Sequence, residues 1–467
     1  MATSANPSVI LIELNELSPA LMERFIQSGE LPNFERFRRQ SQVYTTDAGE
    51  QPPFLEPWIQ WVTVHTGMPY SAHKVFNLAD GHKLDAPRLW DVLSANGRSS
   101  WVCGSMNAGY KPGMNGMVLP DPWATELRPS TLELDAYFEF VQRNVAEYSN
   151  EKIPLSPIDY AKFGVFMATH GLSPESVVGL TLQLAEERAN PKARWKRAAA
   201  LDLLQFDVFR HYYKKMRPSL ATFFANSTAH YQHYFWRNLD PQGFQLKPTE
   251  QDQAEHRDAI LFGYQRMDSL VGRFIDLAGP DTTLVFCTAL SQQPYLLFEA
   301  DGGKLCYRPR DFDKFLTAAG VRDYLEAVPV MTQNFHVRFQ NEADASRASL
   351  QLLALSLGGD RLLAVHVDGN SLHVGCCLHG KIDDRATIEG GPEPLRFGEL
   401  LYQIEGVKSG MHHPDGMLWI RQPDRQHAVH ADKLPLTRVA PMILDMFSIA
   451  PPATMTAELP TRAAAGS

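Results

Sequence analysis

Four apolar runs in this sequence are each the length of one strand, and each lies next to a helix-prone segment. The first run, Val9-Ile10-Leu11-Ile12, is uninterrupted and rich in β-branched residues, which is typical of a strand buried on both faces of a parallel sheet. Similar runs lie at 100–103, 220–225 and 283–288, with helical segments around 89–93, 200–214 and 252–277. This alternation predicts an α/β fold with a doubly wound, mostly parallel sheet flanked by helices.

Two stretches interrupt the alternation. Residues 130–200 are helix-prone and contain prolines but no convincing strand, which predicts a helical insertion. Residues 301–395 contain a strand-like segment at 335–339, a helical segment at 343–357 and a hairpin pattern at 361–377, which predicts a small α+β subdomain. The expected division is core at 1–129, helical insertion at 130–200, core at 201–300, subdomain at 301–395, core at 396–450 and a disordered tail at 451–467.

Charge and cysteine content exclude several classes of protein. The 467 residues carry a formal net charge of −9 and contain no long basic run, which argues against nucleic acid or an anionic membrane as the main partner. The amino-terminal apolar run is broken by Glu13, so we expect neither a signal peptide nor a membrane span. Five cysteines without C-x-x-C spacing indicate reduced thiols, and we therefore expect a cytoplasmic protein.

Polar residues follow the first strand and precede a helix. Glu13-Leu14-Asn15-Glu16 is predicted to lie near the carboxyl edge of the sheet, where ligands of open α/β sheets bind, although turn and cap chemistry would explain the same residues. Further on, Pro57 suits the first position of a helix that ends at Gly67, so Glu56 would lie at the helix amino terminus, on the rim of an anion site. The alternative is a buried helix that Glu56 caps.

Two later polar segments contain histidines. His230 and His233 lie three residues apart after the strand at 220–225, so on a helix they share a face and could bind one metal ion. Aromatic packing with hydrogen-bonded histidines would also account for them. His412 and His413 lie in a loop flanked by glycines before another strand, a pattern that favours a binding site.

The order of these segments resembles the type I phosphodiesterase and nucleotide pyrophosphatase branch of the alkaline phosphatase superfamily. The resemblance covers about 8–125, 200–295 and 400–425. Some of its short sequence motifs are also similar to those of a divergent bacterial group of that superfamily. The four segments of the resemblance are VILIELNELSPALMERFIQSGELPNFERF, EPWIQWVTVHTGMPYSAHKV, FFANSTAHYQHYFW and SGMHHPDGMLWI. The resemblance implies an alkaline phosphatase-like fold, two divalent metals, usually zinc, and a Thr or Ser nucleophile that attacks phosphorus or sulfur.

Several positions depart from the family pattern. Asn15 stands where the resemblance places the first metal-binding Asp, and Ala289 and Leu290 replace an Asp-His pair. The nucleophile position falls at or beside Glu56 and Pro57, so no hydroxyl is available there. One of the two metal sites is therefore expected to be lost.

The other metal site is altered rather than lost. Its Asp aligns with Ala229, but His230 could replace it beside His233 and His412, which align with family ligands. Three imidazoles with an open fourth position would hold one divalent ion, zinc being favoured, and lower the pKa of bound water. The candidate catalytic carboxylates are Glu56, Glu13 and Glu16, and the candidate substrate-binding residues are Asn15, Asn226, Ser227, Ser291 and Gln292.

Two functional hypotheses follow. The first is metal-assisted hydrolysis or transfer of a phosphoryl, phosphodiester or related ester group, through a mononuclear His site with a Glu as base or nucleophile. The substrate would be a small-molecule or glycan-linked ester, with no nucleotide or organic cofactor, and the sequence assigns no oligomeric state. The second is a superfamily relative without metal catalysis, either a binding pseudoenzyme or an enzyme with metal-independent carboxylate chemistry.

Overall fold

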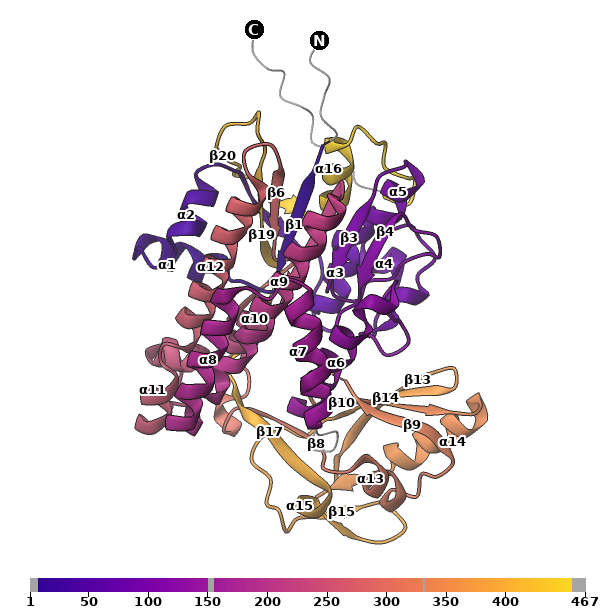
Figure 1. The fold of residues 1–467 in the computed structure, drawn as a ribbon. Coiled ribbons are helices and arrows are strands. Elements are labelled where there is room, and N and C mark those ends of the chain that lie inside the picture. The colour runs from indigo at the N-terminus through magenta and orange to yellow at the C-terminus, as the bar shows by residue number, and fades with distance from the viewer. Residues whose placement is uncertain (1–6, 150–154, 331, 456–467) are drawn as a thin grey trace.

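The fold is built on a mostly parallel central sheet (Figure 1), seen in a computed structural model that describes residues 7–149, 155–330 and 332–455. The strand order is β20-β2-β19-β6-β1-β5-β3-β4, and β21 also pairs with β2. The strands are β1 (Val9–Leu14), β2 (Gln42–Asp47), β3 (Ser100–Cys103), β4 (Gly116–Leu119), β5 (Leu220–Ala225), β6 (Thr283–Cys287), β19 (Asp415–Arg421), β20 (Ala428–Val429) and β21 (Leu434–Pro435).

The four apolar runs are adjacent in the middle of this sheet as β6, β1, β5 and β3. They pair in parallel, whereas β19 runs antiparallel to both β6 and β2. All six residues of β1 are buried, as expected for a strand covered on both faces. The prediction of an α/β fold with a mostly parallel sheet flanked by helices is confirmed.

Helices cover the two faces of the sheet. Alternate side chains of β1 point to opposite faces and so enter different apolar cores. Ile10, Ile12 and Leu14 enter one apolar core, and Val9 and Leu11 enter the other. The first core is covered by α1 (Pro19–Gln27), α2 (Pro32–Arg38), α9 (Ala198–Met216), α10 (Ser227–Leu239) and α12 (Ala259–Ala278), and the second by α3 (Pro57–Thr66), α5 (Leu89–Ala95) and α16 (Val439–Met446). The segment predicted as one helix at 252–277 is divided into α11 (Glu250–His256) and α12.

The chain between β4 and β5 is helical in the described residues. It forms α6 (Asp135–Ser149), α7 (Pro157–Thr169), α8 (Pro174–Ala189) and the 3-10 segment η3 (Pro191–Arg197) before α9. Phe138, Phe163 and Phe166 pack into the first core with α9. Residues 150–154 of the predicted insertion lie outside the described residues.

A smaller layered unit lies at the lower end of the molecule as drawn in Figure 1, opposite the end at which β20 and α16 lie. Its core is built on a four-stranded sheet, and it is joined to the central sheet through the antiparallel pair β8 and β17. The helix predicted at 343–357 ends at Leu353, because Ser356 and Leu357 form a short strand instead. The elements of this unit are β8 (Lys304–Pro309), α13 (Phe312–Ala318), β9 (Tyr324–Pro329), β10 (Asn334–Phe339), α14 (Glu342–Leu353), β11 (Ser356–Leu357), β12 (Asp360–Arg361), β13 (Leu363–Asp368), β14 (Ser371–Cys376), β15 (Thr387–Glu389), β16 (Leu395–Arg396), α15 (Phe397–Leu400) and β17 (Leu401–Lys408).

Two short strands complete the edge at which the polar segments meet. β7 (Ser291–Pro294) follows β6 and pairs in antiparallel fashion with β18 (Gly410–His413), which leads from β17 into β19. The remaining elements are α4 (Tyr70–His73), η1 (Asp80–Lys83), η2 (Leu132–Leu134), η4 (Pro241–Gly243), η5 (Glu299–Asp301) and η6 (Leu436–Arg438). Most of the tail that we expected to be disordered, 456–467, is not among the described residues.

Across the described part of the chain, none of the helices combines the length and the apolar character that a membrane crossing requires.

Candidate metal site

Three side chains from separate elements converge at the carboxyl edge of the central sheet. Glu16 follows β1 in a left-handed backbone conformation with φ of 62°, His233 lies on α10 and His412 lies on β18. His233 Nε2 is 3.3 Å and His412 Nε2 is 3.5 Å from the same carboxylate oxygen, Glu16 Oε2. Glu16 and His412 are buried and His233 is partly buried. We call these three residues the Glu-His-His group.

Hydrogen bonds from neighbouring side chains fix the carboxylate of this group. Gln292 Nε2 donates to Glu16 Oε2 at 2.5 Å, and Asn15 Nδ2 donates to Glu16 Oε1 at 2.8 Å. Asn15 is held in turn by Trp61, whose indole N–H donates to Asn15 Oδ1 at 2.8 Å. The position of Glu16 is therefore set by residues of β7, the turn after β1 and α3.

The imidazole of His233 is oriented by the backbone of β18. His233 Nδ1 lies 3.0 Å from the carbonyl oxygen of Gly410, so the Nδ1–H donates there and the lone pair of Nε2 faces Glu16. The backbone N–H of Ser409 also donates to the carbonyl of His233 at 2.7 Å. These contacts keep β18, and His412 with it, against α10.

The protonation states of the group suit a cation. Burial acts to raise the pKa of Glu16, but His412, His233 and Gln292 outweigh it and lower that pKa to about 2. Burial lowers the pKa of His412 to about 3 and also lowers the pKa of His233. At neutral pH the group is therefore one carboxylate and two neutral imidazoles, which is the ionisation that metal binding requires.

The donor set fits one divalent metal ion. Within the described residues, one ligand atom from each member of the Glu-His-His group lies within 4.8 Å of the others. Two imidazoles and one carboxylate form a recurring ligand set of catalytic zinc sites and of iron(II) sites with open positions. The hydrogen bond from His233 Nδ1 to a backbone carbonyl is also the outer-shell contact that metal-binding histidines usually make.

The positions at which the sequence resemblance places the Asp-His pair of a second metal carry no side-chain donor atoms in the described structure. Ala289 and Leu290 occupy these positions after β6, and both are fully buried apolar side chains without a ligand atom. The residues present do not fit a second ion there.

Glu56 lies beside the group at the amino terminus of α3. Its side chain makes no capping hydrogen bond to the helix, and Oε2 lies 3.4 Å from His412 Nδ1. Burial raises the pKa of Glu56 to about 8, with Glu16 acting in the same direction and Lys408 and Lys304 acting against it. Because 24% of its side chain is exposed, Glu56 can meet a ligand that approaches the group from outside.

Two of the predicted site residues lie apart from the Glu-His-His group. Glu13 alternates onto the α3 face of β1, where Oε1 lies 2.8 Å from His65 Nε2 under complete burial. His230 lies one turn before His233, and its ring packs at 5.2 Å from that of Tyr234. The link between β17 and β18 is hydrogen-bonded to α10 at His233 and Arg237. These residues lie further along the helix than His230.

Three of the predicted substrate-binding residues, Asn15, Asn226 and Gln292, are linked to Glu16 directly or through one hydrogen bond. Asn226 Oδ1 accepts a hydrogen bond of 2.7 Å from Asn15, so the two amides support each other. Ser227 is buried at the first turn of α10, and Ser291 pairs with His413 across β7 and β18. Gln292 also donates to the carbonyl of Ala229 at 3.0 Å. The hydrogen bonds of Asn15 and Gln292 are thus made within the protein.

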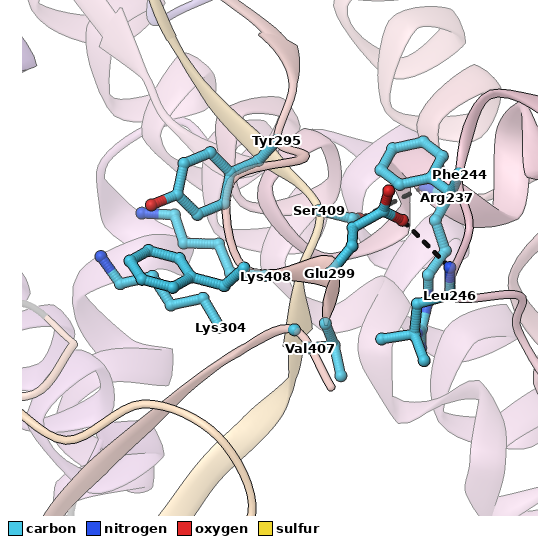
Figure 2. A pocket seen from close by; sticks show the side chains of 11 residues that line it. Arg237, Phe244, Leu246, Tyr295, Glu299, Lys304, Val407, Lys408 and Ser409 are labelled. Carbon is cyan, nitrogen blue, oxygen red and sulfur yellow. Dashed lines mark hydrogen bonds between the residues drawn. The ribbon is translucent and has the colours of Figure 1, made fainter. Parts of the chain in front are cut away.

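Two lysines near the group were not identified from the sequence. Lys304 and Lys408 both act electrostatically on Glu56, and Lys408 also acts on His233 and His412. They line a small pocket with Tyr295, Glu299 and other residues of the junction between the two units (Figure 2). No local motif marks them, since Lys304 and Lys408 meet only through the pairing of β8 with β17.

Comparisons with known proteins assign no family. No protein-family model matches the chain, and no curated protein matches it. Solved structures with a similar fold include phosphonoacetate hydrolase from Sinorhizobium meliloti 1021 in complex with phosphonoacetate, at 12% identity and a TM-score of 0.45 over 95% of this chain and 96% of that chain. The same enzyme with phosphonoformate gives 11% identity and a TM-score of 0.43 over the same shares. Similarities at this level support no inference about activity.

Proposed function

We propose that this protein is a divergent hydrolase or transferase of the alkaline phosphatase superfamily, in its type I phosphodiesterase-like branch, that uses one divalent metal ion. The observation that carries the proposal is the convergence of His233 Nε2 and His412 Nε2 on Glu16 Oε2, at 3.3 and 3.5 Å. The order of the four sequence segments supports the superfamily. The proposed substrate is a small-molecule or glycan-linked ester of a phosphoryl or related group.

The ligand set differs from three histidines. Glu16, rather than His230, would complete the set with His233 and His412, and zinc is the ion we favour. A bound divalent ion would polarise the ester and lower the pKa of a bound water. We also propose that the protein works in the cytoplasm, a proposal that the five free cysteine thiols support.

Glu56 is the proposed proton-transfer or nucleophilic residue. It is the carboxyl group that reaches the Glu-His-His group without being tied to the protein by a capping hydrogen bond. At neutral pH its carboxyl carries a proton that it can donate to a leaving oxygen, and once ionised it can accept one at Oε2. Asn15 and Gln292 would act by positioning Glu16.

The metal content of the purified full-length protein tests the proposal. We expect close to one zinc or other transition-metal ion per chain, and loss of that ion in the double variant His233→Ala, His412→Ala. His230→Ala is the matched control, because it removes an imidazole from the same helix one turn away and should leave the metal content unchanged. Metal-free, fully folded wild-type protein that still turns over its substrate would overturn the proposal.

The reaction class is tested with phosphodiester, phosphomonoester and sulfate ester substrates. We expect Glu56→Gln to lower kcat about 100-fold or more while keeping the metal, since a positioned proton-transfer group contributes about 10²–10⁴-fold. Glu50→Gln is a control at a partly exposed glutamate six residues earlier in the chain. Full activity of the Glu56 variant would remove this residue from the chemistry.

A further inference from the structure

Two lysines lie directly opposite each other where the small unit joins the core. In the antiparallel pair of β8 and β17, Lys408 is the partner of Lys304. Opposed residues of such a pair project from the same face, and like charges in this arrangement destabilise a sheet. Across the described residues, neither ammonium group forms an ion pair with a carboxylate.

The surroundings partly bury this lysine pair without neutralising it. Both side chains are only partly exposed, and burial lowers the pKa of Lys304, with Lys408 acting in the same direction. The Lys304 ammonium lies 5.8 Å from the centre of the Tyr295 ring. Figure 2 shows both lysines extending toward the side of the pocket on which Tyr295 lies.

Glu299, which lines the same pocket, makes its hydrogen bonds to the backbone and not to the lysines. Glu299 Oε1 accepts hydrogen bonds from the backbone N–H groups of Gln245 at 2.8 Å and Leu246 at 3.1 Å. In Figure 2 its carboxylate points toward that backbone and away from the lysines. The pair therefore presents two positive charges for which the residues that the structure describes supply no counter-charge at contact distance.

The lysine pair belongs to the neighbourhood of the Glu-His-His group. Ser409 follows Lys408 directly and is hydrogen-bonded to the backbone of His233, and His412 lies four residues after Lys408. The positive charge of Lys408 also reaches His233, His412 and Glu56. An anion between the lysines would thus lie on the rim of the proposed reaction site.

We propose that Lys304 and Lys408 together bind a second anionic group of the substrate, a phosphate or a carboxylate, so that the preferred substrates carry one anionic group beyond the reacting ester. The position of this anionic group beside a reacting ester rests on the proposed function. Binding of an anion by the lysine pair does not rest on the proposed function, because it needs neither a metal ion nor turnover.

The first experiment measures anion binding by the full-length protein after treatment with a chelator. Inorganic phosphate and acetate are titrated separately by calorimetry into wild-type protein, Lys304→Gln, Lys408→Gln and the double variant. We expect one site for at least one anion, weakened about tenfold or more in each single variant, because each loses a charge-assisted contact. The tighter of the two anions identifies the class. Lys314→Gln, at an exposed lysine of the same unit, should bind as the wild type does.

Thermal unfolding separates this role from a structural one. Without anion, each glutamine variant should unfold at the same or a higher temperature than the wild type, since a like-charge pair has been removed. Added phosphate or acetate should stabilise the wild type more than the variants. Wild-type protein that binds neither anion, or variants that bind as tightly as the wild type, would overturn the inference.

Kinetics with metal-loaded protein distinguish this failure from failure of the proposed function. We expect the double variant to raise KM for 4-carboxyphenyl phosphate about tenfold more than for phenyl phosphate. An equal effect on both substrates overturns the inference and leaves the proposed function standing. Absence of hydrolysis of any ester, with anion binding by the lysines intact, overturns the proposed function alone.

Discussion

At the scale of single residues, three glutamates near one sheet edge have three different environments. Glu16 is ionised and hydrogen-bonded among histidines, and Glu56 is partly exposed beside His412. Glu13 is fully buried against His65, and its second oxygen has no hydrogen-bond partner among the described residues. Sequence proximity to Glu16 therefore does not make Glu13 part of the candidate site.

Substitution of Glu13 should affect stability rather than metal binding. Glu13→Ala leaves His65 buried without its partner, and we expect a loss of about 3–5 kcal/mol in the free energy of unfolding. Glu13→Gln keeps the volume and a polar partner, so its loss should be about 1–2 kcal/mol. Urea unfolding of both variants, with metal analysis alongside, checks this. A Glu13→Ala protein with wild-type stability and no activity would instead favour a catalytic role.

At the scale of elements, the geometry of the Glu-His-His group depends on how closely β18 approaches α10. A Cβ atom at Gly410 would lie 2.2 Å from the carbonyl oxygen of Gln232 and 2.6 Å from Gln292 Oε1. Glycine is therefore needed here for close approach rather than for a turn. The same residue also supplies the carbonyl that orients His233.

Gly410→Ala should weaken metal binding without unfolding the protein. The added methyl group must push β18 from α10, which shifts His412 and the acceptor of His233. We expect metal affinity to fall about 10–100-fold, as for other losses of outer-shell support. Gly406→Ala is the control, since a Cβ atom there meets nothing within 4 Å. Competition with a chromogenic chelator measures the affinity, and equal values for both variants would contradict the prediction.

At the scale of the whole molecule, the core and the small unit meet through a charged and histidine-rich contact. Lys83 of η1 lies 2.9 Å from Asp80 and 3.8 Å from Asp368 of the small unit. Histidines from three neighbouring strands lie beside it, with the His373 ring 4.8 Å from His336 and 6.2 Å from His366. Burial lowers the pKa of His373 to about 4, with His336 and His366 acting in the same direction and the two aspartates against it.

This contact should make the protein less stable in weak acid. The pKa of His373 is lower in the folded chain than the usual 6.5, so between about pH 6.5 and 4 the unfolded chain binds more protons, and stability is lost as pH falls. His373→Gln should reduce the slope of the unfolding free energy against pH in this window, by up to about 1.4 kcal/mol per pH unit. Urea unfolding at pH 7, 6 and 5 measures it. His379→Gln, at an exposed histidine, is the control, and equal slopes in both variants would contradict the prediction.

The sequence by itself determined the class of fold. The runs that became β1, β3, β5 and β6 are apolar enough to be buried on both faces, so local pattern was sufficient to predict a parallel sheet with helices around it. It also indicated that polar residues after β1, β5 and β6 would gather at one edge, because parallel strands end on the same side.

Only the tertiary structure decided which of those residues meet. His230 and His233 share a helix face in sequence, but the path of β18 along α10 brings only His233 to Glu16 and His412 among the described ligand groups. Strand alternation directs Glu13 under α3, while the left-handed turn at Glu16 directs that residue to the edge. Lys304 and Lys408 are more than a hundred positions apart, and the register of β8 with β17 alone makes them neighbours. Periodicity in a sequence fixes the face of an element, whereas the packing of elements far apart in the chain fixes which faces touch.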